Sequence, residues 1–243
     1  MVAELGFLIG QQTPFALMGQ KYKQETRIQK KKYGCRSNRN NSTGTPESGS
    51  LKDTVNETYD HKLFEQADYS ETGLSGQEFE NCTFKNCNFS NADLSKSRYI
   101  DCKLIDCNLS NAKISRTGLQ NVTFLSCKII GVDFSTCLPF LFEVSFKKCN
   151  LDYSKFIKNR LKKTKFKECT IREAIFTETD LTGASFDDCD LSNTVFSRAN
   201  LSQADFTAAR NYSINLELNT ARKTKFSYSG ITGLLSQYDI TIE

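Results

Sequence analysis

The chain has 243 residues, of which 38% are hydrophobic, with 32 Lys and Arg residues against 28 Asp and Glu residues. This length suits one compact domain with a tail. No stretch approaches the roughly 20 consecutive apolar residues of a membrane-spanning helix, and Glu4 stands where a secretory signal would carry positive charge. The composition therefore predicts a cytoplasmic protein without membrane contact, whose ten cysteines are reduced thiols.

The first 59 residues carry the whole positive excess, with nine Lys and Arg against five Asp and Glu. A basic run at 21–39 precedes a linker rich in Ser, Thr, Gly and Asn. This composition predicts a disordered basic tail and linker over residues 1–59. The tail is either a solvated leader or an arm that contacts nucleic acid, and nucleic-acid binding is not expected elsewhere in the chain.

From Phe64 onward, a large apolar residue recurs at every fifth position, which fits neither the 3.6-residue period of a helix nor the 2.0-residue period of a strand. The first run is Phe64, Tyr69, Leu74, Phe79, Phe84, Phe89, Leu94, Tyr99, Leu104, Leu109, Ile114, Leu119, Phe124, Ile129 and Phe134. The second run, displaced by two residues, is Phe146, Leu151, Phe156, Leu161, Phe166, Ile171, Phe176, Leu181, Phe186, Leu191, Phe196, Leu201 and Phe206.

The residue two places before each large one is small almost throughout, as in Ala67, Cys82 and Ala92. Segments such as NADLS, TGASF, RANLS and QADFT repeat one unit. Over residues 62 to 231 the chain resembles the pentapeptide-repeat family, whose consensus is A(D/N)LXX. The resemblance implies an all-β fold over residues 60–231, a right-handed quadrilateral parallel β-helix with four pentapeptides per coil. Because such units stack only on their neighbours, repetition supplies the core.

Because one coil contains 20 residues, side chains that are 20 residues apart are predicted to stack. Identical shapes then lie above one another and fill a narrow interior without voids. The cysteines fall on the same spacing in three ladders, and Cys35 and Cys137 are the two expected to be exposed. The CxxxxC pairs within the ladders lack the spacing of zinc sites. We therefore expect the ladder cysteines to pack in the core and to bind no metal. The expected aromatic core consists of Phe146, Phe166, Phe186 and Phe206 on one face and Phe156, Phe176 and Phe196 on another.

The register shifts within residues 135–145, because Phe134 and Phe146 are twelve residues apart instead of ten. Two residues must bulge outward, and Pro139 cannot donate to a strand ladder. We expect Pro139, Phe140, Leu141 and Phe142 to form an apolar protrusion or a kink. The Lys-rich stretch that follows is interpreted as solvated surface.

The repeat frays after Phe206, and residues 232–243 are expected to cover the open end of the solenoid. A short helix and then a terminal strand are predicted, either as a cap or as a dimerisation segment. The segment resembles the C-terminus of Qnr-type quinolone-resistance proteins, which implies a homodimer joined tail to tail. The residues assigned to this role are Leu234, Leu235, Tyr238, Ile240 and Ile242.

No catalytic motif accompanies the repeats, since the single histidine, His61, precedes the first full unit and no phosphate-binding glycine loop is present. We therefore predict a non-enzymatic protein without cofactors. The Qnr-type resemblance implies binding to DNA gyrase or topoisomerase IV and protection from quinolones, whereas the wider family implies a scaffold with another partner. The neutral body argues against close mimicry of DNA. The candidate contact residues are Ile105, Leu125, Phe140, Leu141, Phe142, Asp180, Asp187, Asp188 and Asp190.

Overall fold

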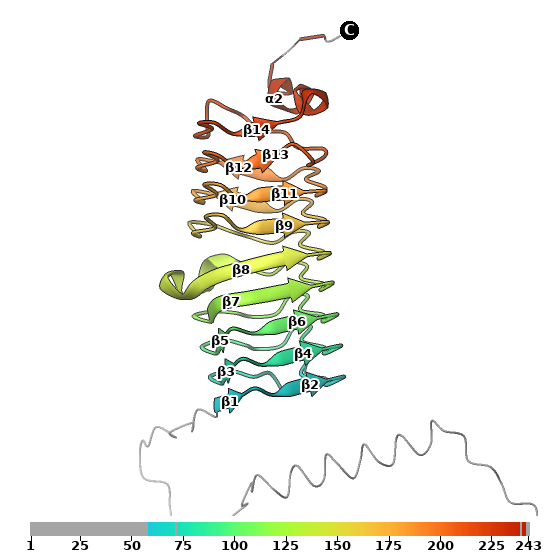
Figure 1. Cartoon of the computed structure of the whole chain (residues 1–243), viewed down its shortest axis with the longest axis vertical. Coiled ribbons are helices and arrows are strands. Elements are labelled where there is room, and N and C mark those ends of the chain that lie inside the picture. Colours follow the sequence, from blue (N-terminus) through green and yellow to red (C-terminus); the bar gives the residue numbers. More distant parts are fainter. Residues whose placement is uncertain (1–57, 71, 239, 242–243) are drawn as a thin grey trace, which may run out of the picture. The chain divides into compact units, whose positions relative to one another are not determined.

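The computed structural model describes residues 58–70, 72–238 and 240–241. These residues wind into a parallel β-solenoid of stacked coils (Figure 1), which confirms the predicted quadrilateral β-helix. Residues 1–57 of the tail expected at 1–59, together with Cys35 and Ile242, lie outside the described residues. No helix within the described part of the chain is long and apolar enough to cross a membrane.

Most strands are three residues long, because each occupies one flat side of a coil. In chain order they are β1 (Thr58–Asp60), β2 (Leu63–Glu65), β3 (Glu78–Glu80), β4 (Thr83–Lys85), β5 (Arg98–Ile100), β6 (Lys103–Ile105), β7 (Gly118–Leu125), β8 (Phe142–Lys147), β9 (Lys165–Lys167), β10 (Ile175–Thr177), β11 (Ser185–Asp187), β12 (Val195–Ser197), β13 (Asp205–Phe206) and β14 (Lys225–Phe226). The helical turns are η1 (Phe134–Thr136), η2 (Pro139–Leu141), η3 (Tyr228–Gly230) and α2 (Thr232–Leu235).

The strand register advances by one 20-residue coil. Phe166 of β9 lies opposite Phe186 of β11, and the paired strands of the described coils are all parallel. The sheet begins earlier than expected, because Thr58 pairs with Glu78 and the ring of Tyr59 stacks on that of Phe79 at 5.2 Å. Residues 58 and 59, assigned to the tail, therefore belong to the solenoid.

Each coil turns its corners through single residues in left-handed backbone conformation, such as Asn81, Asn86 and Asn91, with φ between 52° and 57°. Asn, Asp and Gly tolerate this conformation best. At Gly131, where φ is 70°, an added Cβ would lie 2.7 Å from Oδ1 of Asn111 in the preceding coil. A side chain there would require the Asn111 side chain to move.

The predicted aromatic stacks are present. The rings of Phe166 and Phe186 lie 4.9 Å apart and within 1° of parallel. Phe156 and Phe176 stack at 4.8 Å on another face. The two stacks meet edge to face, as Phe176 and Phe186 do at 88°. Offset stacking and edge contacts are the arrangements that aromatic pairs prefer. The rings therefore fill the interior both along the solenoid axis, by stacking, and across it, by edge-to-face contacts.

The small inward residues connect consecutive coils. Oγ1 of Thr117 donates to the carbonyl of Leu94 at 2.8 Å, and Oγ of Ser154 donates to the carbonyl of Ile129 at 2.9 Å. The same position in other coils holds a cysteine, whose thiol contacts the equivalent carbonyl. The inward hydroxyls of Thr117 and Ser154 thereby find partners in the neighbouring coil.

All nine cysteines in the described part of the chain are free and buried. The bridge between Lys128 and Asn150 places Cys149 directly above Cys127. The ladders at 87/107/127 and 149/169/189 are therefore one continuous column across the register shift. Cys137 was expected to be exposed, and this was wrong: its thiol lies inside and contacts the carbonyl of Ile114.

The turn that accommodates the two-residue insertion leaves two side chains exposed, those of Pro139 and Phe140. Phe142 was expected to protrude, but it is buried and pairs with Leu119 in the adjacent strand. Leu141 is half-buried against Gly118, where an added Cβ would come within 3.1 Å of it. Phe140 is 78% exposed. The expected protrusion of four apolar residues is thus reduced to Pro139 and Phe140 in a tight turn.

The C-terminal segment covers the last coil. The predicted short helix is α2, and its Leu234 packs against the hydrophobic core. Gly233 lies so close to the backbone of Tyr212 that an added Cβ would be 1.9 Å from its carbonyl oxygen. Tyr238 and Ile240 are exposed, and residues 240–241 form no strand, in contrast to the expected terminal strand.

Candidate interaction surfaces

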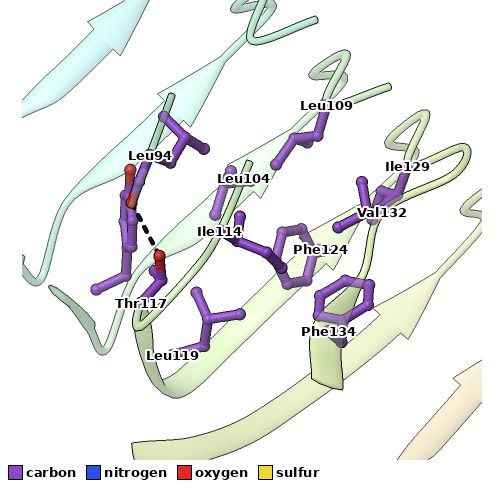
Figure 2. Close-up of a pocket in the computed structure, with 11 residues that line it drawn as sticks. Leu94, Leu104, Leu109, Ile114, Thr117, Leu119, Phe124, Ile129, Val132 and Phe134 are labelled. Carbon is purple, nitrogen blue, oxygen red and sulfur yellow. Dashed lines mark hydrogen bonds between the residues drawn. The ribbon is translucent and has the colours of Figure 1, made fainter. Parts of the chain in front are cut away.

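The interior of the solenoid contains a small cavity of about 20 Å³ in its aliphatic section. Figure 2 shows the side chains of Leu104 and Phe124 beside this space and the hydrogen bond from Thr117 to Leu94. Leu104 is in register with Phe84 on one side and with Phe124 on the other. A leucine thus interrupts a column of phenylalanines, and the missing ring volume explains the cavity.

Replacing Leu104 with Phe should raise the free energy of unfolding by about 0.5–2 kcal/mol, because it fills this cavity and continues the Phe84–Phe124 column. Urea denaturation measures the change. Leu181→Phe is the matched control, since Leu181 is fully buried between Leu161 and Leu201 and overpacking should cost about 1–3 kcal/mol. Equal effects of the two variants would contradict the assignment of the cavity to Leu104.

This cavity is too small for a substrate, so the candidate contacts in the described coils lie on the outer faces. Within the described ranges, no group of three or more His, Cys, Asp or Glu side chains gathers as a metal site. His61 is exposed and lies 2.6 Å from the carboxylate of Asp60. Hydrogen bonding to His61 lowers the pKa of Asp60. Nothing else in this pair suggests a nucleophile or a general base.

The apolar ladder expected at Ile105 and Leu125 exists as a pair in register. Both side chains are half-buried, and neither is among the strongly exposed apolar residues. Lys85 and Lys147 occupy the same column on either side. The ladder is therefore two residues long, with a cation at each end.

The four candidate acids do not form an open negative stripe. Asp180 accepts hydrogen bonds from the amide and hydroxyl of Thr182 and lies 3.2 Å from Nζ of Lys162. Partial burial alone would raise the pKa of Asp180, but these partners hold it below its usual value. In Asp190, burial is likewise outweighed by hydrogen bonds from Ser192, and the pKa is lowered.

The other two acids are exposed but paired. Asp187 lies 3.2 Å from Nζ of Lys167, and Asp188 lies 2.8 Å from the guanidinium of Arg210. The hydrogen bond and charge of Asp187 raise the pKa of Lys167. Each acid thus meets a cation from an adjacent coil, which weakens the electrostatic form of partner binding that these residues were expected to provide.

Pairing between coils is a feature that sequence reasoning missed. Glu178 lies between Lys158 and Arg198, with Nζ of Lys158 at 3.6 Å and the Arg198 guanidinium at 3.0 Å. These three residues are 20 apart. Once the coil length is known, opposite charges at this spacing predict such pairs, so the signal was present in the sequence.

One ion pair with a buried carboxylate also connects two coils. Asp152 is buried, and its carboxylate accepts hydrogen bonds from the backbone amide and the guanidinium of Arg172, the shortest at 2.6 Å. The Asp152 hydrogen bonds raise the pKa of Arg172. Because an uncompensated buried carboxylate is costly, this pair is structural.

The model of the pentapeptide repeat region matches residues 77–156 and 140–208. No curated protein matches the chain. Among solved structures, the chain is similar to HetL, a pentapeptide repeat protein involved in heterocyst differentiation regulation from the cyanobacterium Nostoc sp. strain PCC 7120, with a TM-score of 0.57 and 16% identity over 72% of this chain and 89% of HetL.

A second structural match is QnrB1, a plasmid-mediated fluoroquinolone resistance protein. Its full-length structure matches with a TM-score of 0.37 and 20% identity, over 75% of this chain and 100% of QnrB1. The match to the repeat model spans more than half of the sequence and coincides with the stacked coils. The chain therefore belongs to the pentapeptide-repeat family.

Proposed function

We propose that the protein is a non-catalytic rod that acts by binding a protein partner on its outer faces. The observation that carries this proposal is the closed interior. The aromatic columns, the small inward residues and the aliphatic section leave a cavity of only about 20 Å³, whereas ligand pockets usually measure about 300–1,000 Å³. This cavity is too small for a ligand, so the proposal places recognition on the outer faces of the described coils.

The hydrogen bonds and ring stacks between coils support the same proposal. They fix the outward side chains at a constant spacing along the rod, and a pre-ordered surface loses little entropy on binding. Family membership is consistent with this role. The cytoplasm is the compartment that the proposal implies for an intracellular partner.

DNA gyrase, with topoisomerase IV as a related target, is the partner that the Qnr-type resemblance implies. Because Asp180, Asp187, Asp188 and Asp190 are paired or hydrogen-bonded, this form of the proposal depends on the exposed apolar side chain of Phe140. A second copy is the proposed partner of the exposed Tyr238 and Ile240 at the C-terminal end.

We expect purified protein to restore supercoiling by gyrase in the presence of a fluoroquinolone, at concentrations that do not inhibit the enzyme. Phe140→Ala should weaken this rescue, because a truncated aromatic anchor commonly costs 2 kcal/mol or more, roughly 30-fold in affinity. Val195→Ala is the matched control, since Val195 is 49% exposed on another face. If wild-type protein gives no rescue with gyrases from several bacteria, gyrase is excluded and the scaffold form with another partner remains.

A further inference from the structure

One continuous sheet of the solenoid carries an even row of outward side chains. Strands β4, β6, β7, β8 and β9 are neighbours in this sheet and lie one above another in Figure 1. Their register places one outward residue of each strand opposite the next. We call this row the mixed column, and in order along the solenoid it consists of Lys85, Ile105, Leu125, Lys147 and Lys167.

The insertion does not interrupt the mixed column. The register between β7 and β8 shifts between Leu119 and Val122, before the column is reached, and Leu125 then lies opposite Lys147. Because neighbouring strands are about 4.8 Å apart, the five side chains leave the sheet at even steps over about 19 Å. A partner can therefore contact all five side chains along one line.

One end of the mixed column carries uncompensated positive charge. Lys147 lies opposite Lys167 of the next coil, and like charges on directly opposed residues of neighbouring strands are destabilising. Lys165 lies on the same side of β9 as Lys167. Asp187 forms an ion pair with Lys167 at 3.2 Å, whereas Lys147 and Lys165 form none within the described coils. Three exposed lysines thus share a single carboxylate.

The rest of the mixed column combines an apolar centre with further lysines. Ile105 and Leu125 are half-buried and directly adjacent. Lys85 is exposed and lies 3.1 Å from Glu65 of the preceding coil. Lys103 is two residues from Ile105 on the same side of β6, and it forms no ion pair with a described residue. The apolar pair is therefore bordered by positive charge at both ends.

Two exposed acids lie near this face but outside the mixed column. Asp106 occupies the corner after Ile105, where φ is 53°. Glu143 is four residues before Lys147 in β8, about 13 Å away along an extended strand. Asp106 opposes an acidic group beside the apolar pair, and Glu143 is too distant to neutralise Lys147. The two lysine ends of the column are therefore the attractive positions for carboxylates.

The spacing of the mixed column matches one face of an α-helix. Residues that follow each other at alternating intervals of three and four form one stripe along a helix, and they are separated by about 5 Å along its axis. The strand spacing of the solenoid is about 4.8 Å. Over the whole column the difference amounts to only about 2 Å, which the flexible lysine side chains absorb.

We propose that this face binds an amphipathic α-helix of a partner protein, which lies along the solenoid axis. Two apolar residues of the helix cover Ile105 and Leu125. An acidic residue one turn before them meets Lys85, and acidic residues one and two turns after them meet Lys147 and Lys167. Apolar stripes on helices are common recognition elements, and complementary charges fix the register. The inference rests on the proposed protein-binding function and adds the form and chemistry of the partner.

A helix fits this face better than an extended peptide or a nucleic acid does. An extended peptide presents every second side chain to one side, at intervals of about 6.6 Å, and falls out of step with a spacing of about 4.8 Å. Duplex binding commonly neutralises about 6–10 phosphates, which exceeds the lysines on this face. A phosphate backbone would also leave the apolar pair at the centre without a complementary partner.

Fluorescence anisotropy with a labelled helical peptide tests the proposal on the full chain. The peptide carries Glu, Leu, Leu, Glu and Glu along one stripe, in the order that matches the mixed column, with Ala and Gln at the other positions. We expect salt-sensitive binding that Leu125→Ala weakens about fivefold to tenfold. Lys147→Glu should weaken binding by at least about tenfold, because a carboxylate then faces a carboxylate of the peptide.

The matched controls change the same residue types on another face. Ile175 is an outward, half-buried residue of β10, and the exposed Lys155 lies opposite it in the preceding coil without an ion pair to a described residue. Ile175→Ala and Lys155→Glu should bind the peptide as wild type does. Circular dichroism of the four variants checks that each is folded.

The proposal is overturned if wild-type protein does not bind the peptide, or if a peptide with Gln in place of each Glu binds equally well. Equal weakening by Lys155→Glu and Lys147→Glu would also overturn it, because binding would then follow net charge and not this face. A peptide with a central proline, which breaks the helix, should not bind, and equal binding by it would contradict a helical partner.

Two further outcomes separate this face from other modes of binding. Tighter binding of duplex DNA that Lys147→Glu abolishes would overturn the proposal in favour of a nucleic-acid surface. Gyrase rescue by wild-type protein that does not bind the peptide would refute this face and leave the protein-binding rod intact.

Discussion

Replacing Phe176 with Ala should lower the free energy of unfolding by about 3–5 kcal/mol. Phe176 is fully buried between Phe156 at 4.8 Å and Phe196 at 5.2 Å, and its edge meets Phe166 and Phe186. Removing the ring leaves a cavity in a narrow tube whose walls are held by hydrogen bonds between coils, so the surroundings cannot collapse into it. Urea denaturation followed by circular dichroism measures the change.

The control for this variant is Ile175→Ala. Ile175 precedes Phe176 in β10, points outward and is half-buried, so truncation should cost far less than loss of the ring. A loss below about 1 kcal/mol for Phe176→Ala would be too small for any core phenylalanine. Such a result would contradict the stacked-ring interior.

Asn219→Ala should also destabilise the protein strongly, because the buried side chain of Asn219 completes the last coil where the repeat becomes irregular. Its Nδ2 donates to the carbonyls of Phe196 and Asn215, at 2.9 and 2.8 Å, and its Oδ1 accepts from the amide of Ala199 at 2.9 Å. Each buried backbone group left without a partner costs about 1–3 kcal/mol.

Comparing the melting temperatures of the Asn219→Ala and Thr220→Ala variants isolates the contribution of the Asn219 side chain. Thr220 is the exposed neighbour of Asn219, and surface substitutions usually change stability by no more than about 0.5 kcal/mol. Equal melting temperatures for the two variants would show that the hydrogen bonds of the Asn219 side chain do not stabilise the last coil.

The sequence predicted the coil and its core well, because the five-residue period leaves a single arrangement that buries every large side chain. Phe156, Phe176 and Phe196 stack as expected from their 20-residue spacing. The outcome at the insertion could not be predicted in the same way. Phe140, Leu141 and Phe142 are all large and apolar, so periodicity gives no reason to bury Phe142 and expose Phe140.

That choice depends on contacts distant in the sequence. Gly118 provides the space that Leu141 fills, and the Thr117 carbonyl fixes the turn through Leu138. The candidate surfaces show the same contrast. The pairing of Asp187 with Lys167 follows from their 20-residue spacing, whereas the exposure of Phe140 depends on which residue of the insertion points outward.

Hydrogen exchange across the insertion is the most direct test of a single rigid rod with a closed interior. Amides of Thr123 and Phe124 in β7 and of Ser145 and Phe146 in β8 lie in paired strands, so both pairs should exchange with similar, strong protection, and only the turn around Phe140 should exchange quickly. Strong protection in β8 together with rapid exchange in β7 would show that the insertion divides the solenoid into two separately opening bodies, and would contradict the rod.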